Sequence, residues 1–150
     1  MLYKGLKKMI SGMIDYSKNH ESYLSTDSVF VNRSIIFCSD SYKNLAVVGK
    51  YVVLSDETGS SAVYSKNDES VSLIAGDTNS CIIYYTFIGT TMVFSSDIKD
   101  IIQKCRNILS NEERSTAMGI TPEKLTEIIK NISTIPTGGH ITYTESGISY

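Results

Sequence analysis

Residues 84–105, YYTFIGTTMVFSSDIKDIIQKC, decide the fold because their hydrophobic period changes partway along the segment. The first half is rich in β-branched and aromatic residues, which favour strands, and Gly89-Thr90 predicts a tight hairpin between two of them. The second half predicts a helix, because its apolar residues recur at helical spacing, at Ile98, Ile101, Ile102 and Cys105. The joint at 95–97, Ser-Ser-Asp, predicts a capped helix start. The segment therefore predicts two antiparallel strands that lead directly into a helix.

Further strands are predicted on both sides, because short β-branched runs alternate with polar turns. They cover 28–38 with a turn at Asn32-Arg33, 44–55 with a turn at Gly49-Lys50, 61–65, 70–76 and a hairpin at 140–150. A second helix is predicted at 121–132, with Thr121 as its cap and Pro122 at its first position. Apolar residues at helical spacing predict an amphipathic helix at 2–14. Together these patterns indicate an α+β fold, with layered antiparallel sheets flanked by helices, in a single domain over 1–150.

Composition excludes several classes of partner and site. A net charge of −2 argues against nucleic acid, and no stretch reaches the roughly 20 apolar residues of a membrane span. The cysteines Cys38, Cys81 and Cys105 are far apart and lie beside apolar runs, which predicts buried thiols in a reducing cytoplasm. His20 and His140 are also far apart, and the paired carboxylates fall in turns. No metal site and no catalytic acid–base pair is therefore predicted.

Residues 61–150 carry a resemblance to a known family. The strand end LIAGD, the strand IIYY and the joint VFSSDIKDI follow in order, and NISTIPTGGHITYTESGISY comes downstream. This order resembles the end of the glutaminase domain of asparagine synthetases and other class II glutamine amidotransferases. In that family a strand ending in Gly-Arg-Asp, a PLYY-like strand and FASE(I/L)KAL precede a hairpin that joins the synthetase domain. The resemblance implies a degenerate and shortened Ntn-hydrolase-type αββα sandwich.

The resemblance also bears on residues in the first sixty positions. Arg33 would match the arginine that holds the glutamine carboxylate, and it is the one substrate-binding residue predicted. Ser55 and Asp56 would stand where the family has the Asn-Gly of its oxyanion hole, and a carboxylate there opposes an oxyanion. The family's nucleophile is an N-terminal cysteine, whereas residue 2 here is Leu2 and the first cysteine is Cys38. The helical region with the family's acidic glutamine-binding residue is missing. No catalytic residue is therefore predicted.

Three functions follow from these observations. The first is a non-hydrolysing glutaminase-like scaffold of an asparagine-synthetase-related, ATP-dependent amide ligase, whose partner is a synthetase domain in cis or in trans. That domain, rather than this one, would bind ATP and Mg. The second is a free-standing small-ligand or protein-binding module without catalytic activity. The third is an enzyme with a different nucleophile, for instance Cys38 or Ser39. The tyrosine and isoleucine content is compatible with a homodimer interface.

Overall fold

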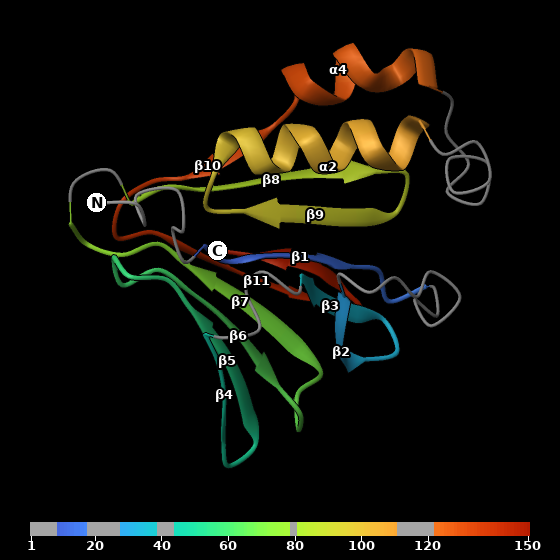
Figure 1. Ribbon diagram of the computed structural model, residues 1–150. Coiled ribbons are helices and arrows are strands. Elements are labelled where there is room, and N and C mark those ends of the chain that lie inside the picture. The colour runs from blue at the N-terminus through green and yellow to red at the C-terminus, as the bar shows by residue number, and fades with distance from the viewer. Residues whose placement is uncertain (1–8, 18–27, 39–43, 79–80, 111–121) are drawn as a thin grey trace.

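Two six-stranded antiparallel sheets form the centre of the described structure (Figure 1). The computed structural model describes residues 9–17, 28–38, 44–78, 81–110 and 122–150. The first sheet contains, in spatial order, β10 (Ser133–Ile135), β8 (Ile83–Ile88), β9 (Thr91–Ser95), β1 (Ser11–Ile14), β3 (Ile35–Cys38) and β2 (Ser28–Asn32). The second contains β12 (Gly147–Ser149), β11 (His140–Thr144), β7 (Ser70–Ile74), β6 (Ser61–Ser65), β5 (Tyr51–Ser55) and β4 (Leu45–Val48).

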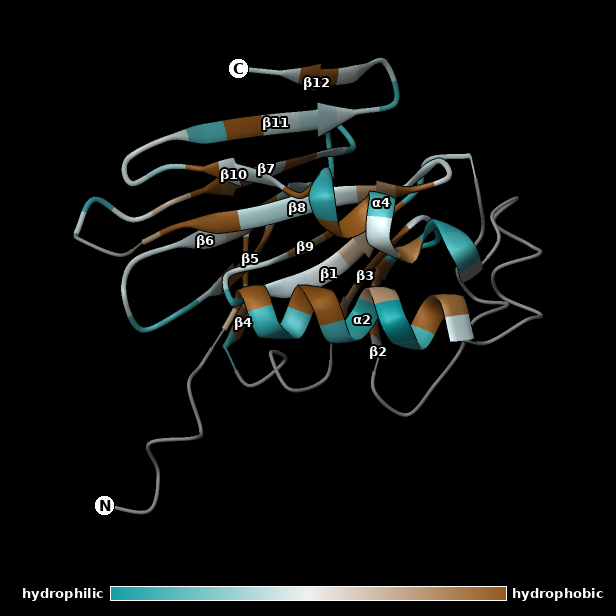
Figure 2. Ribbon diagram, turned by 90° about the horizontal axis from the view of Figure 1, so that it is seen from above, coloured by the Kyte–Doolittle hydropathy of each residue, from teal (hydrophilic) through white to brown (hydrophobic). Residues whose placement is uncertain are grey.

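The helices lie together on the outer face of the first sheet. They are α2 (Ile98–Ser110), the 3-10 turn η3 (Pro122–Lys124) and α4 (Leu125–Lys130). Figure 1 shows α2 and α4 above β8 and β9, with the second sheet on the opposite side of the first. Figure 2 shows hydrophobic and hydrophilic residues alternating along α2, as expected for a helix that buries one side. The described residues thus form three layers, one of helices and two of strands.

The predicted fold class, an α+β αββα sandwich with helices on both outer faces, is wrong. The fold is β-rich, and the described residues place no helix on the outer face of the second sheet. A helix layer forms where a sheet offers an apolar face to bury. The outward positions of β6, β7 and β11 carry many small hydroxyl side chains, including Ser61, Ser72 and Thr142. These residues offer a second helix layer little apolar surface.

The helix predicted at 2–14 is also wrong for its described part, because residues 11–14 form β1. Residues 1–8 lie outside the described residues. β1 pairs with β3 on one side and with β9 on the other, so it lies inside the first sheet. Ile10 and Ile14 enter the core between the sheets, and Met13 packs against the core under the helices. A strand that is covered on both faces has apolar residues on both faces. In this segment their spacing resembles that of an amphipathic helix, which is why the sequence predicted one.

The segment at 84–105 is confirmed as two strands and a helix. β8 and β9 pair from Tyr84–Ser95 to Ile88–Thr91, and Gly89 has a positive φ of 62° at the turn. Asp97 N donates to Ser95 Oγ at 3.0 Å, and Lys99 N donates to Asp97 Oδ1 at 2.9 Å. Side chains at the joint therefore accept hydrogen bonds from the first backbone N–H groups, as predicted for a capped start.

The remaining predicted strands are confirmed as β2 to β7, β11 and β12, with turns near the predicted positions. The second predicted helix is shorter than expected: Pro122 opens a 3-10 turn, and regular helix runs from Leu125 to Lys130. Its predicted cap, Thr121, lies outside the described residues. Apolar side chains form two clusters, one between the sheets and one between the helices and the first sheet.

Gly12 is the tightest point of the first sheet. A Cβ added there would lie 2.5 Å from Ile36 O, 2.8 Å from Phe94 Cζ and 3.0 Å from Phe37 Cδ1. A backbone carbonyl in the middle of a sheet cannot move away without breaking its strand pairing. Only glycine therefore fits at this position of β1.

Gly12→Ala is expected to lower the free energy of unfolding by at least about 3 kcal/mol, because overpacking a strand interior forces backbone shifts. Gly49→Ala is the control, since its added methyl meets nothing within 4 Å. The free energy of unfolding of this control should fall only by the cost of placing alanine at a positive φ, about 1–2 kcal/mol. Urea unfolding monitored by circular dichroism measures both. Equal losses in the two variants would contradict the packing argument.

Asp15 joins the end of β1 to the β8–β9 turn. Its side chain is 1% exposed, and its Oδ2 accepts hydrogen bonds from Thr90 Oγ1 at 2.7 Å and Thr91 Oγ1 at 2.9 Å. Oδ1 accepts from Ser17 N at 2.9 Å. Burial raises the pKa of Asp15, but the hydrogen bonds from Ser17, Thr90 and Thr91 outweigh it and hold the pKa below its ordinary value of 3.8. The ionised carboxylate therefore stabilises the fold.

Asp15→Asn should destabilise the protein near neutral pH by about 1–3 kcal/mol, the usual cost of disrupting a buried hydrogen-bonded charge. Because the folded-state pKa is depressed, the contribution is complete above pH 3.8 and disappears as pH falls through the folded value. The stability gap between wild type and variant should therefore narrow in acid. Denaturant titrations at several pH values measure this gap. Asp68→Asn, in the exposed β6–β7 turn, is the control and should show a much smaller gap.

Candidate functional site

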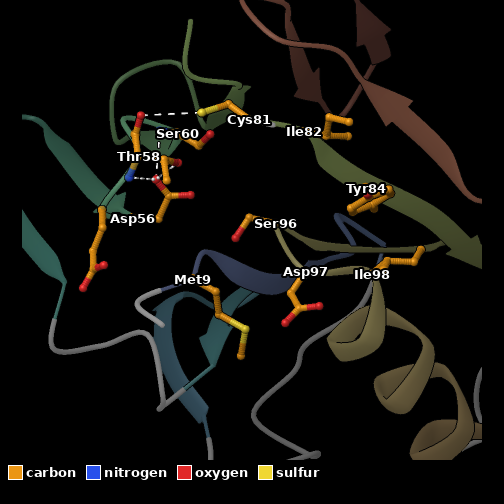
Figure 3. Close-up of a pocket in the computed structure, with 11 residues that line it drawn as sticks. Met9, Asp56, Thr58, Ser60, Cys81, Ile82, Tyr84, Ser96, Asp97 and Ile98 are labelled. Carbon is orange, nitrogen blue, oxygen red and sulfur yellow. Dashed lines mark hydrogen bonds between the residues drawn. The ribbon is translucent and has the colours of Figure 1, made fainter. Parts of the chain in front are cut away.

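A cavity of about 320 Å³ lies where the two sheets meet the start of α2 (Figure 3). One wall is the turn between β5 and β6, at Asp56 to Ser60. The other walls come from Cys81 and the beginning of β8, from Met9 before β1, and from residues 96–98 at the joint. Segments from both sheets and from the helix thus contribute to one hollow.

The turn at residues 56–60 is held by its own carboxylate. Asp56 Oδ1 accepts hydrogen bonds from Thr58 N and Thr58 Oγ1, both at 2.8 Å, and from Ser60 N at 3.0 Å. Ser60 Oγ in turn accepts from Gly76 N at 2.9 Å, which ties the turn to the end of β7. An aspartate that accepts from backbone N–H groups two and four residues later typically stabilises a turn. Asp56 therefore shapes the wall of the cavity.

The joint before α2 forms the facing wall. Ser96 N donates to Ile10 O at 2.9 Å, and Ile10 N donates to Ser96 Oγ at 3.1 Å. This reciprocal pair fixes the start of α2 against the residues that precede β1. Asp97 and Ile98 then line the cavity from the first turn of the helix.

Cys81 is the thiol of the cavity. Its Sγ lies 3.0 Å from Thr78 Oγ1 and donates to Thr58 O at 3.6 Å. Gly76 packs behind it, since a Cβ there would lie 2.9 Å from the sulfur. Hydrogen bonding to Thr58 and Thr78 holds the pKa of the Cys81 thiol below its ordinary value. The side chain is 3% exposed, so only small molecules could reach it.

The charged side chains that line the cavity are all acidic. They are Asp56, Glu57 and Asp97, and the lining contains no lysine, arginine or histidine among the described residues. Acyl transfer from an amide needs donors aimed at the developing oxyanion. It also needs a base beside the nucleophile. The charged groups of the cavity are carboxylates, which would repel an oxyanion, and among the described lining residues no histidine or lysine accompanies Cys81. This arrangement does not support hydrolysis of glutamine.

Arg33, the predicted substrate-binding residue, is not brought to the cavity. It is exposed in the β2–β3 turn, beside Ser34, whose O accepts a hydrogen bond from Asp15 N at 2.9 Å. Asp15 follows β1, whereas the cavity residue Met9 precedes it. Arg33 therefore lies at the opposite end of β1 from the cavity. Its binding of a carboxylate stays a prediction.

The alternative nucleophile Cys38 lies elsewhere. Ser11 Oγ donates to Asp100 Oδ2 at 2.7 Å and lies 3.7 Å from the Cys38 Sγ, and Asp100 pairs with Lys104 at 2.6 Å. Burial raises the pKa of the Cys38 thiol, although Lys104 and Ser11 act in the opposite direction. The Cys38 thiol is therefore protonated and lies beside the hydrogen bonds that join the first sheet to α2. A protonated thiol is a poor nucleophile. Ser39 lies outside the described residues.

The remaining predicted residues fall as follows. Cys105 is buried under α2, where burial raises its pKa to about 11. His140 is exposed on β11, and His20 and Leu2 lie outside the described residues. Asp56 lines the cavity, and Ser55 ends β5.

Sequence reasoning did not identify the cavity or the setting of Cys81. The turn signal DETGS was visible, and an aspartate two residues before a threonine is a local pattern that predicts a side-chain-stabilised turn. Nothing local predicts that this turn meets Cys81 and the joint, because the three segments come from different parts of the chain. Only the packing of one sheet on the other brings them together.

Comparison with known proteins adds no relative. The chain matches no family model, and no curated protein matches it. Within the described part of the chain, no group of three or more His, Cys, Asp or Glu residues could hold a metal ion. No helix in that part is both long and apolar enough to cross a membrane.

The three thiols should differ in the pH dependence of their alkylation. Reaction of native protein with iodoacetamide should reach half its maximal rate at a lower pH for Cys81 than for Cys38, and only near pH 11 for Cys105. Peptide mapping by mass spectrometry follows each site. Thr78→Val removes one hydrogen-bond partner and should move the Cys81 midpoint upward. A Cys38 midpoint below that of Cys81 would contradict the assignment.

Proposed function

We propose that this chain is a non-hydrolysing, glutaminase-like scaffold of an asparagine-synthetase-related, ATP-dependent amide ligase in the cytoplasm. The observation that carries the proposal is the position of the last three strands. β10 is the outer strand of the first sheet, and β12 is the outer strand of the second. The stretch 133–149, whose counterpart in the resembling family leads into the synthetase domain, therefore forms one outer strand in each sheet.

The order of elements supports the same reading. β6 and β7 are followed by the β8–β9 hairpin, α2, a short helix and the β10–β12 segment, which is the order in which the resembling motifs occur. Ser96, at the joint before α2, exchanges two hydrogen bonds with Ile10 and so holds the helix start against the first sheet. These contacts fit a structural role for the joint. The resemblance thus falls on residues that hold the fold together.

The chemistry of the cavity supports the non-hydrolysing part of the proposal. Its charged residues are Asp56, Glu57 and Asp97, and among the described lining residues no histidine or lysine accompanies the Cys81 thiol. An enzyme nucleophile, its activator and its oxyanion donors act as a unit, so a site without two of them loses nearly all its rate. The ligase chemistry, with its ATP and Mg, would belong to the synthetase domain.

The partner domain is expected against the side formed by β10 and β12. Tyr150 is 87% exposed at the end of this side, and Ser133 and Thr134 are exposed on β10. An exposed tyrosine next to an unpaired strand edge is a typical anchor at a protein interface. The domain could be joined in cis or could associate in trans.

The purified chain should release no ammonia from glutamine above a buffer blank, because the charged residues of its cavity are carboxylates, which oppose a developing oxyanion. A coupled glutamate dehydrogenase assay measures this release, with an active class II glutaminase as the positive control. The reading frame beyond Tyr150, or a neighbouring frame, should encode an SGG(L/V)D(S/T) pyrophosphatase loop. Glutamine hydrolysis by this chain would overturn the scaffold proposal.

The proposed partner side is tested by charge substitution. Tyr150→Arg should reduce ATP-dependent pyrophosphate release with ammonia as amine, or weaken binding of the separate synthetase domain, by about tenfold. Gln103→Arg, on the exposed side of α2, is the matched control and should leave both unchanged. Equal behaviour of the two variants would place the partner on another surface.

A free-standing small-ligand module is the second candidate, and the cavity is the observation that favours it. Its volume of about 320 Å³ is at the lower end of the range of small-molecule sites. A rise in melting temperature with a small amine or amino acid, abolished by Ser60→Val in the cavity wall, would favour this reading. The absence of a synthetase domain in the same or a neighbouring reading frame would favour it too.

A further inference from the structure

Among the described residues, no helix covers the outer face of the second sheet, and its strands carry no Asp, Glu, Lys or Arg. The outward residues of β4 to β7, β11 and β12, which alternate with the core residues, form what we call the open face. Its central cross-strand row is Ala46, Val53, Val63, Ser72, Thr142 and Ser149, which pair successively across all six strands. The outward positions on either side of this row contain no Asp, Glu, Lys or Arg; their titratable side chains are those of His140 and Tyr51.

An uncharged face is unusual for a sheet that only meets water, because solvated strands normally carry charged residues on that side. Large apolar groups are exposed here: Val48 is 60% exposed, Tyr51 39% and Ile74 38%. The charged residues lie instead in the turns at its margins, at Lys50 and at Lys66. An uncharged centre with a charged rim is the usual anatomy of a protein interface.

We propose that a second copy of this chain docks on the open face, sheet against sheet, about a two-fold axis. A two-fold contact brings each outward row against the same row of the partner, so like charges would repel. The strands of the open face carry no Asp, Glu, Lys or Arg that could repel in this way. Its hydroxyl groups are both donors and acceptors, so they are complementary to themselves.

Removing the hydroxyl groups of the open face from water costs little free energy where they already have hydrogen-bond partners within the sheet. Ser72 and Thr142, near the middle of the central row, lie within hydrogen-bonding distance across neighbouring strands at 2.9 Å. A hydroxyl that is satisfied within its own sheet can leave water without an orphaned polar group. The valines Val53 and Val63 beside them supply apolar surface that gains from burial.

The size of the face fits a dimer of modest affinity. Six strands about 4.8 Å apart and about 16 Å long span about 400 Å² in projection. Corrugation by side chains raises the area buried to about 600 Å² per copy, or about 1,200 Å² in total, the lower limit of specific interfaces. We therefore expect a dissociation constant in the micromolar range.

Other occupants fit the open face less well. A layer of amphipathic helices packs on a continuous apolar surface, which the hydroxyls of Ser61, Ser72 and Thr142 interrupt here. Nucleic acid needs a basic surface, which the strands of this face lack. A second copy matches the face because the strands carry no like charges to repel and their hydroxyls are self-complementary.

Sedimentation equilibrium across the micromolar range tests the proposal. Wild-type chain should change from the mass of one protomer to that of two as concentration rises. Val63→Lys and Ser72→Lys each place like charges together across the two-fold axis and should weaken the dimer at least about tenfold. Thr134→Lys, at an exposed position on the edge strand of the first sheet, is the matched control and should leave the dimer intact. Circular dichroism and thermal melts establish that each variant is folded.

Two results would overturn the proposal. One is a monomer at every concentration. The other is a dimer that Val47→Lys disrupts while folded Val63→Lys and Ser72→Lys leave it unchanged, because Val47 lies on edge strand β4 and this pattern indicates edge-to-edge pairing. Neither result bears on ligase scaffolding, which is tested separately through Tyr150.

Discussion

The burial of β1 on both faces and both edges is the constraint on which the structure depends. Gly12 lets this strand fit between β3 and β9, with Phe37 and Phe94 packed over it at a ring separation of 6.1 Å. Residues beside β1 then anchor both ends of this strand. Ile10 ties the strand's start to the joint before α2, and Asp15 ties its end to the β8–β9 turn. A central strand held at both ends sets the position of the helices and of one wall of the cavity.

The cavity and the open face are consequences of how the second sheet packs on the first. Its inner side chains fill the space between the sheets, while the turn at 56–60 reaches the joint and encloses the cavity. The cavity is acidic, because Asp56 stabilises a turn and Asp97 accepts a hydrogen bond at the helix start. These carboxylates serve structure first and leave a site unsuited to stabilising an oxyanion. The proposed scaffold role draws support from these structural contacts of the carboxylates.

Local patterns predicted most elements but not their layers. The strands from β2 to β9 were predictable because period-2 runs and turn residues act within a few positions, as at Gly49 and Gly89. β1 was not, since a strand buried on both faces loses its alternation. The fold class was missed for a related reason: whether a sheet face is covered depends on partners that lie elsewhere in the chain. Cys81 was predicted as a buried thiol, and its burial is confirmed, but its place in a cavity was not predicted.

The sequence by itself determined the strand–hairpin–helix unit at 84–105, the turns and the amphipathic side of α2, because these depend on backbone preferences and spacing over a few residues. Tertiary structure alone decided that Ser11 to Ile14 pair as a strand, that Arg33 and the cavity lie at opposite ends of β1, and that both helices share one sheet. The physical reason is that burial is a property of the assembled layers. A residue's contribution to a core, a cavity or a bare face appears only when segments distant in sequence pack together.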